Sequence, residues 1–214
     1  MNSQSLSSRL GWVLFAALLG GVAASGFQDA TQKNAVVDIS KVVEGSDYGK
    51  GNQQAFAQMK QSREDLLEFI DTNRVLTTEQ AQKLRDLTVK PTLTDSEKAE
   101  LERVKADVIA ANKRWSELAT KTTLTPEERT LLQDYATRSQ AMSDYAQRLL
   151  NQFSNEMAAW ADKQKLDSVD KARAAVSEVA KAQGYNMVFE VGVAPYGAND
   201  LTADALKAMN AKKP

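Results

Sequence analysis

Neither cysteine nor histidine occurs among the 214 residues of this chain. Without cysteine it has no disulfide, no thiolate nucleophile, no cysteine zinc site and no attachment point for a lipoprotein anchor. Without histidine it lacks the usual general base, the Ser–His and Cys–His dyads and the commonest transition-metal ligand. Catalysis by carboxylates alone stays open as a class, but no constellation of residues supports it. We therefore predict a protein that is not an enzyme and that uses no cofactor and no metal.

Aromatic residues are scarce, at 7% of the chain, and the mean hydropathy is −0.44. This composition argues against one thick globular core and favours elongated helices that share a narrow apolar seam. The 27 basic and 28 acidic residues nearly cancel. Such a balance does not predict nucleic-acid binding, which calls for a basic surface.

The first 24 residues have the pattern of a cleavable secretory signal. Arg9 precedes an apolar run from Gly11 to Ala24, which is too short for a comfortable membrane span, and small residues follow at its end. We predict cleavage after Ala24, with Ser25 as the alternative, and an uncleaved anchor as the competing interpretation. Removing Arg9 leaves 26 basic and 28 acidic residues, a net charge of −2. An exported chain without cysteine fits the bacterial periplasm.

Strand patterns occur only near the two ends of the chain. We predict a strand over 35–39, rich in β-branched residues, then one helical turn and a glycine-rich corner. A second strand is expected over 187–191, then a turn, a further short strand and a capped helix over 203–210. The fold class is therefore α+β, with a small β-rich oligomerisation body built by the chain ends. We assign residues 25–50 and 168–214 to this body.

For residues 51–167, the sequence predicts a long α-helical coiled-coil arm inserted between the strands. Apolar residues recur at three- and four-residue steps in four helical pieces, which begin near Asn52, Thr77, Thr94 and Thr125. At the last three starts, threonine stands three residues ahead of Glu or Gln, which is the pattern of a capping box. A further segment is expected to begin after 167–170. Because the four pieces cannot form two limbs of equal length, one of them is expected to pack back as a third helix.

Three short strands cannot make a stable isolated sheet, so the body is expected to associate with other copies of the chain. The residues predicted to build the body of this oligomer are Val36, Ile39, Met187, Phe189, Val191, Tyr196, Leu201 and Leu206.

Both ends of the chain resemble the Skp/OmpH family of periplasmic chaperones for outer-membrane proteins. The resemblance is carried by Val179–Val191, by Val193-Ala-Pro-Tyr-Gly197, by Asp200-Leu-Thr-Ala-Asp-Ala-Leu-Lys207 and, less specifically, by Val36–Val43. It implies a homotrimer whose helical arms enclose a cavity, where unfolded outer-membrane proteins are held without ATP. Contact with the membrane periphery or with lipopolysaccharide is a further expectation. Two features depart from the family. Its members are often strongly basic, whereas this chain is nearly neutral, and the arm of this chain has more segments than a plain two-helix hairpin.

Exposed aromatic residues of the arm are the candidates for holding an unfolded client. The four predicted client-binding residues are Trp115, Tyr145, Phe153 and Trp160. An alternative hypothesis is a periplasmic coiled-coil spacer or tether whose arms bind one defined folded partner. Saturable binding to that partner, with indifference to unfolded chains, would distinguish the tether from the chaperone.

Overall fold

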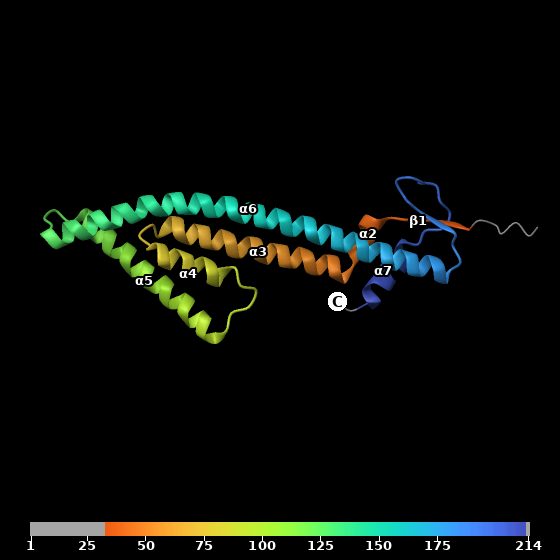
Figure 1. Ribbon diagram of the computed structural model, residues 1–214, viewed down its shortest axis with the longest axis horizontal. Coiled ribbons are helices and arrows are strands. Elements are labelled where there is room, and N and C mark those ends of the chain that lie inside the picture. Colours follow the sequence, from red (N-terminus) through yellow and green to blue (C-terminus); the bar gives the residue numbers. More distant parts are fainter. Residues whose placement is uncertain (1–32, 213–214) are drawn as a thin grey trace, which may run out of the picture. The chain divides into compact units, whose positions relative to one another are not determined.

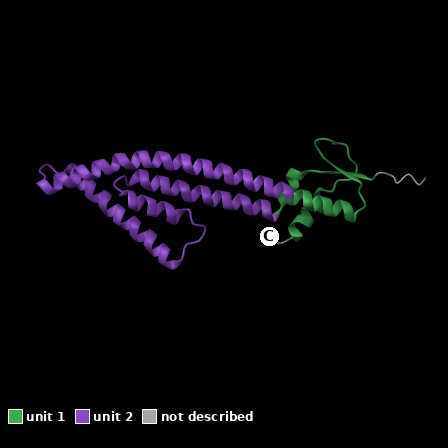
Figure 2. Ribbon diagram, in the orientation of Figure 1, with its two compact units in different colours: residues 1–46, 171–214 green, residues 47–170 purple. Residues whose placement is uncertain are grey.

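The computed structural model describes residues 33–212, and 76% of these residues are helical. The predicted signal peptide and the lead that follows it lie outside the described residues. The elements are β1 Asn34–Val37, α2 Ile39–Gly45, α3 Asp47–Thr72, α4 Thr78–Thr88, α5 Asp95–Thr120, α6 Pro126–Ala182, β2 Met187–Glu190 and α7 Thr202–Ala211 (Figure 1). They form two compact units, which Figure 2 distinguishes by colour. Unit 1 comprises residues 1–46 and 171–214, and unit 2 comprises residues 47–170.

Unit 2 is entirely helical and contains α3, α4, α5 and the greater part of α6. Its main core collects apolar residues from all four helices and from the connection between α3 and α4, namely Leu66, Ile70, Leu76, Ala81, Leu84, Val104, Val108, Met142, Leu149 and Phe153. On α6, Tyr135, Met142 and Leu149 are all buried and stand seven residues apart. This is the heptad spacing of a coiled-coil seam, as the sequence predicts. Both α4 and α5 contribute to the core, so two helices pack back, where the prediction expected one.

The prediction of a glycine-rich corner before the first arm helix is wrong. Helix α3 begins at Asp47, directly after Ser46, and continues through Gly49 and Gly51. Glycine inside a helix costs about 1 kcal/mol relative to alanine. Contacts with α6 help to offset that cost, and one of them is the hydrogen bond that the Tyr48 hydroxyl donates to the Gln164 side chain at 3.1 Å.

The expected start of a new helix after residues 167–170 is also wrong, because α6 runs without a break for 57 residues. Ser168, which suggests a cap in the sequence, donates its hydroxyl to the carbonyl of Gln164 one turn back, at 2.6 Å. The same hydroxyl accepts a bond from the Asn52 amide at 3.3 Å. A serine whose hydroxyl bonds to the carbonyl four residues back can lie inside a helix, at a small cost to its stability. The polar pair Asn52–Ser168 instead links α3 to α6.

All three predicted capping boxes are present. At α4 and α5 the Thr77 and Thr94 hydroxyls accept from the amides of Gln80 and Glu97, whose side chains accept in return from the threonine amides. At α6 the Thr125 hydroxyl accepts from the Glu128 amide at 3.3 Å. Pro126 occupies the first helical position, as predicted. These boxes satisfy the helix-start amides at the three joints of unit 2.

We expect Thr77→Ala to destabilise unit 2 by about 1 kcal/mol, since it removes the acceptor for the Gln80 amide. Urea unfolding followed by circular dichroism measures this loss. Thr78→Ala is the matched control, because Thr78 is the exposed first residue of α4. Equal unfolding midpoints for the two variants would contradict a capping role for Thr77.

Unit 1 is built around a two-stranded parallel sheet of β1 and β2. The register pairs Asn34 with Met187 and Val37 with Glu190. The other edge of β1 forms a single bridge, between Val36 and Asp200. Beside the sheet, Ala35, Ala180 and Leu201 form a buried cluster. Helices α2 and α7 pack together so closely that a Cβ atom added at Gly45 would lie 3.1 Å from Leu206.

The first strand is shorter than predicted, because Asp38 caps a helix. The Asp38 carboxylate accepts from the amide of Lys41 at 2.9 Å, and Asp38 takes an extended conformation with ψ of 94°. Ile39 is therefore the first residue of α2 and not the last of a strand. The segment 35–39 is apolar apart from Asp38, and the strand ends before this residue because Asp38 caps the helix that follows.

The second predicted strand, over 187–191, is observed as β2 over residues 187–190. Gly184 ends α6 as expected, with a φ of 71° that favours glycine. The further short strand is not found among the described residues. After β2, the carbonyl of Glu190 accepts from the amides of Val193 and Ala194, and the chain turns instead of extending. The returning chain meets β1 at an isolated bridge between Val36 and Asp200 and does not form a strand there.

Candidate functional site

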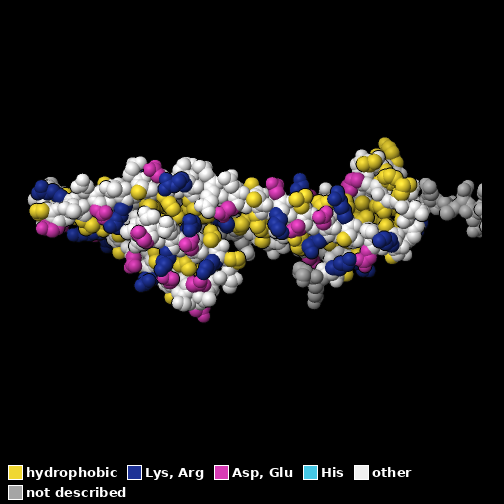
Figure 3. Space-filling model, in the orientation of Figure 1, with side chains coloured by type: hydrophobic (Ala, Val, Ile, Leu, Met, Phe, Trp, Pro, Cys, Tyr) yellow, Lys and Arg dark blue, Asp and Glu magenta, His cyan; other side chains and the backbone are white. Residues whose placement is uncertain are grey.

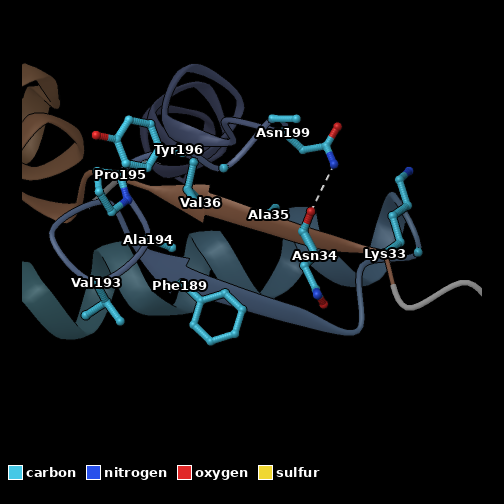
Figure 4. Close-up of a pocket in the computed structure, with 13 residues that line it drawn as sticks. Lys33, Asn34, Ala35, Val36, Phe189, Val193, Ala194, Pro195, Tyr196 and Asn199 are labelled. Carbon is cyan, nitrogen blue, oxygen red and sulfur yellow. Dashed lines mark hydrogen bonds between the residues drawn. The ribbon is translucent and has the colours of Figure 1, made fainter.

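The first candidate site is a hollow on unit 1, between the sheet and the loop that follows β2. Its volume is about 940 Å³, and it is lined by residues 33–36, Gly184, Phe189 and the loop residues 193–199. Figure 4 shows Tyr196 and Pro195 on the loop near Val36, with Phe189 and Val193 along the same hollow. The Asn199 side chain holds the loop by donating to the carbonyl of Asn34 at 2.9 Å (Figure 4).

The loop presents apolar side chains to solvent. Tyr196 is 98% exposed and Val193 is 74% exposed, and Met187 on β2 is 43% exposed. In Figure 3, apolar side chains gather over this region of unit 1. Exposed apolar groups clustered beside an open hollow are typical of surfaces that bind another protein.

One edge of the sheet is open as well. The carbonyl of Val37 accepts from the amide of Val191 at 2.9 Å, so by alternation along β2 the backbone of Val188 faces away from β1. Because the sheet has only two strands, the described part of the chain supplies no strand partner on that edge. An unpaired edge of this kind can accept a strand from another chain.

The residues predicted to build the oligomer body all lie in unit 1 but differ in exposure. Val36 and Leu201 are buried within the unit itself, at 5% and 2% exposure. Phe189, Val191 and Leu206 are half-buried, and Ile39 is half-buried at the start of α2. Met187 and Tyr196 are exposed and are therefore available for contact with another copy.

The four residues predicted to hold a client all lie in unit 2, and their surroundings differ. Phe153 is 2% exposed and belongs to the main core. Trp115 packs against the buried cluster of Val75, Leu118 and Tyr135. Trp160 is half-buried and pairs with Phe56, with 5.9 Å between the ring centroids.

Tyr145, the fourth of these residues, is half-buried against the main core. Its hydroxyl is buried and has no hydrogen-bond partner among the described residues. Desolvation raises the pKa of this hydroxyl above its usual range. Of the four, Phe153 is almost fully buried, and the other three are partly accessible.

Sequence reasoning missed two exposed apolar residues. Val193 stands in the segment Gly192–Pro195, where glycine and proline indicate a turn and therefore exposure. Leu150 is 48% exposed on α6, directly after the buried Leu149. A leucine one position beyond a heptad seam points to the flank of the seam, and this spacing could have identified it.

Charged residues of both signs are interspersed over the surface of unit 2 (Figure 3). At the joint between α4 and α5, Lys90 pairs with Glu97, and Lys83 pairs with Glu100 at 2.5 Å. The hydrogen bond from Lys90 and those from Thr94 lower the pKa of Glu97 to about 2. Lys121 similarly lowers the pKa of Glu128 at the start of α6. These carboxylates stabilise helix joints, and their perturbed pKa values do not indicate catalysis.

We expect acid to weaken the joint between α4 and α5. Since folding lowers the pKa of Glu97 from 4.5 to about 2, its contribution to stability is complete above pH 4.5 and is lost as the pH falls from 4.5 to 2. In Glu97→Gln, which preserves the capping-box geometry, the melting temperature is expected to fall less between pH 5 and pH 2 than in the unaltered protein. Glu68→Gln, an exposed change on α3, is the control. If Glu97→Gln and Glu68→Gln gave parallel pH profiles, the joint would not depend on this carboxylate.

Within residues 33–212, no group of three or more acidic side chains is placed to hold a metal ion. Over the same range, no helix combines the length and apolarity needed to span a membrane. The exposed apolar loop, the hollow beside it and the open sheet edge of unit 1 are surfaces suited to binding a polypeptide.

Comparison with known protein families gives one match, which covers most of the chain. The model of the family described as "Outer membrane protein (OmpH-like)" matches residues 33–209. No curated protein matches the chain significantly.

Proposed function

Since the chain belongs to the OmpH-like outer membrane protein family, a family of periplasmic chaperones for outer-membrane proteins, we propose that it is an ATP-independent holdase of the periplasm. It binds unfolded outer-membrane proteins and keeps them soluble without chemical change. The binding space lies between the helical units of several copies, and the copies associate through unit 1 as a homotrimer.

The observation that carries the proposal is the open two-stranded sheet of unit 1. A parallel sheet of two four-residue strands is marginal by itself, and its free edge and the adjacent hollow both remain to be filled. A second copy provides a matching strand edge and matching apolar side chains, among them Met187 and Tyr196. A closed ring of three copies leaves no free edge, which is the usual solution to an exposed strand.

The helical unit supports the holding role through its balanced surface. Charges of both signs along unit 2 keep the assembly soluble and do not favour clients of one charge. Partly exposed aromatic residues, such as Trp115 and Trp160, provide weak apolar contacts. Several weak contacts from three copies hold a client firmly, yet each contact can be released separately.

Two measurements test the proposal. Sedimentation equilibrium of the mature protein at micromolar concentration is expected to give the mass of three chains. A stable folded monomer would refute assembly through unit 1.

The second measurement dilutes an outer-membrane barrel protein out of urea and follows its aggregation by light scattering. We expect suppression at a ratio of about one trimer per client. An intact trimer that fails to suppress aggregation, but binds one folded envelope protein saturably, would support the tether hypothesis instead.

A further inference from the structure

An apolar groove runs between α3 and α6 on unit 2, and its volume is about 370 Å³. The side chains along it are Phe56, Lys60, Arg63, Glu64, Leu67, Leu150, Phe153, Ser154, Met157, Ala158 and Ala161. On α6 these residues recur at three- and four-residue steps from Leu150 to Ala161, a distance of about 16 Å at a rise of 1.5 Å per residue. Small residues at Ser154, Ala158 and Ala161 leave the space open.

The groove continues a surface that α4 covers elsewhere. Ala81 and Leu84 of α4 are fully buried in the core cluster that contains Leu66 and Phe153. Phe153 also lines the groove, as does Leu67 beside Leu66. Helix α4 ends at Thr88, and the adjoining part of the α3–α6 surface has no third element over it in the described chain. Leu150 is consequently 48% exposed.

Arg63 borders the groove, and one of its three guanidinium nitrogens lacks a hydrogen-bond partner among the described residues. Its side chain is buried, with 9% of the residue exposed, and its guanidinium lies 5.1 Å from the centre of the Phe153 ring. Two of its nitrogens donate, to the carbonyl of Met59 at 3.2 Å and to Glu156 at 3.3 Å. Its Nε is buried and has no acceptor among the described residues. A buried donor without an acceptor is unfavourable, so a ligand that draws the Arg63 side chain toward the groove and offers it a carbonyl gains that hydrogen bond.

The charges around the groove are already paired. Arg63 pairs with Glu156 at 3.3 Å, and Lys60 pairs with Glu64 at 3.7 Å. A charged ligand therefore gains little here, and an uncharged apolar ligand fits the walls. This balance argues against a fatty acid or another carboxylate as the occupant.

Backbone geometry distinguishes the remaining occupants. In a helix, each carbonyl already accepts one bond from within the helix, so a docked helix offers only the second lone pair of its carbonyls. An extended chain keeps its carbonyls free. It also places side chains of one face about 6.6 Å apart, so that about three of them fit the length of the groove.

We propose that this groove binds an extended segment of unfolded polypeptide in which every second side chain is apolar. The apolar side chains enter the groove beside Leu150, the intervening polar side chains face solvent, and a backbone carbonyl accepts from Arg63. Membrane-spanning β-strands carry this alternation, with about ten residues per segment. The inference rests on the proposed function, for which it defines the recognised sequence pattern.

Binding of two labelled peptides to the full mature protein tests the groove by fluorescence polarisation. The first peptide has nine residues, with leucine or phenylalanine at positions 2, 4, 6 and 8 and serine or glutamine at the others, and one additional lysine flanks it at each end. The second has the same composition with the apolar residues at positions i, i+3, i+4 and i+7. We expect the alternating peptide to bind more tightly. Tighter binding of the helical pattern, or no binding of the alternating one, would overturn the proposal.

Leu150→Lys is expected to weaken binding of the alternating peptide about tenfold, because it places a charge at the groove wall. Ile109→Lys is the matched control, since Ile109 is an aliphatic residue of α5 with 53% exposure outside the groove. Circular dichroism checks that both variants keep their helices. Equal peptide affinities of the two variants would mean that the peptide binds outside the groove.

A photoreactive p-benzoylphenylalanine at Ser154 gives a second readout. We expect it to crosslink to the alternating peptide, and the same group at Ser116 on α5 to give no such product. Crosslinking of Ser154 to another copy of the chain, with no peptide product, would identify the groove as a self-association surface and overturn the proposal. If Leu150→Lys still suppresses aggregation and its peptide affinity is unchanged, the groove proposal is refuted but the holdase function stands. If the protein binds the peptide but suppresses no aggregation, the holdase function is refuted but the groove proposal stands.

Discussion

Phe153→Ala is expected to lower the free energy of unfolding of unit 2 by about 3–5 kcal/mol. The Phe153 ring is 2% exposed in the core that α3, α4, α5 and α6 share, and it lies under the guanidinium of Arg63. Removing it leaves a cavity and takes away a contact of a buried cation. The substitution thus removes both apolar burial and a cation–π interaction.

Urea unfolding followed by tryptophan fluorescence measures this loss directly. The tryptophans that remain after the predicted cleavage, Trp115 and Trp160, both belong to unit 2 and report on it. Leu150→Ala is the control, three residues away on the same helix and 48% exposed, and it is expected to cost less than about 1 kcal/mol. Similar midpoints for both variants would mean that Phe153 faces outward, as a client-binding residue would.

Gly197→Ala is expected to destabilise unit 1 by about 1–3 kcal/mol and to weaken self-association. A Cβ atom at position 197 would lie 2.1 Å from Cγ1 of Val36. Val36 cannot yield easily, because its side chain is branched and its strand is fixed on this side. Its amide donates to Asn199 at 2.7 Å, and its carbonyl accepts from Leu201 at 2.9 Å. The loop must therefore move away from β1, and the hollow beside it changes shape.

Gly192→Ala provides the comparison within the same loop. A Cβ atom at position 192 meets nothing within 4 Å, so this change is expected to be neutral or to stabilise by less than about 1 kcal/mol. Hydrogen exchange at the Val36 amide measures local stability, and sedimentation measures association. If Gly197→Ala protected that amide as well as Gly192→Ala does, the close approach between the loop and β1 would be absent.

Local signals in the sequence located most helix starts. The boxes at Thr77 and Thr94 and the proline at 126 act through neighbours three or four residues away, so a single sequence contains all of their partners. Gly184 ended α6 for the same reason. Errors occurred where a distant residue decides the outcome. Helix α3 runs through Gly49 because of contacts with α6, more than 100 residues away, and no local pattern reveals them.

The candidate sites were harder to predict because exposure depends on packing between segments. Phe153 and Leu150 are both apolar and lie three positions apart, and one is buried while the other is exposed. The difference arises because α4 packs against the cluster that holds Phe153 and leaves the flank of the seam uncovered. The heptad pattern identifies the seam but does not reveal where a third helix will lie over it.

The pairing of β1 with β2 has a consequence for the order of synthesis. Lys33 and Asn186, which join the two strands through the Asn186 side chain, are 153 residues apart, whereas the helices of unit 2 are consecutive in the chain. Because synthesis proceeds from the N-terminus, the chain can complete unit 2 before β2 exists, so the sheet must close late. A chain truncated before Met187 would keep its helices but lack the strand edge that we propose for assembly. Only full-length chains would then enter the oligomer, and the C-terminal segment would act as a check on completeness.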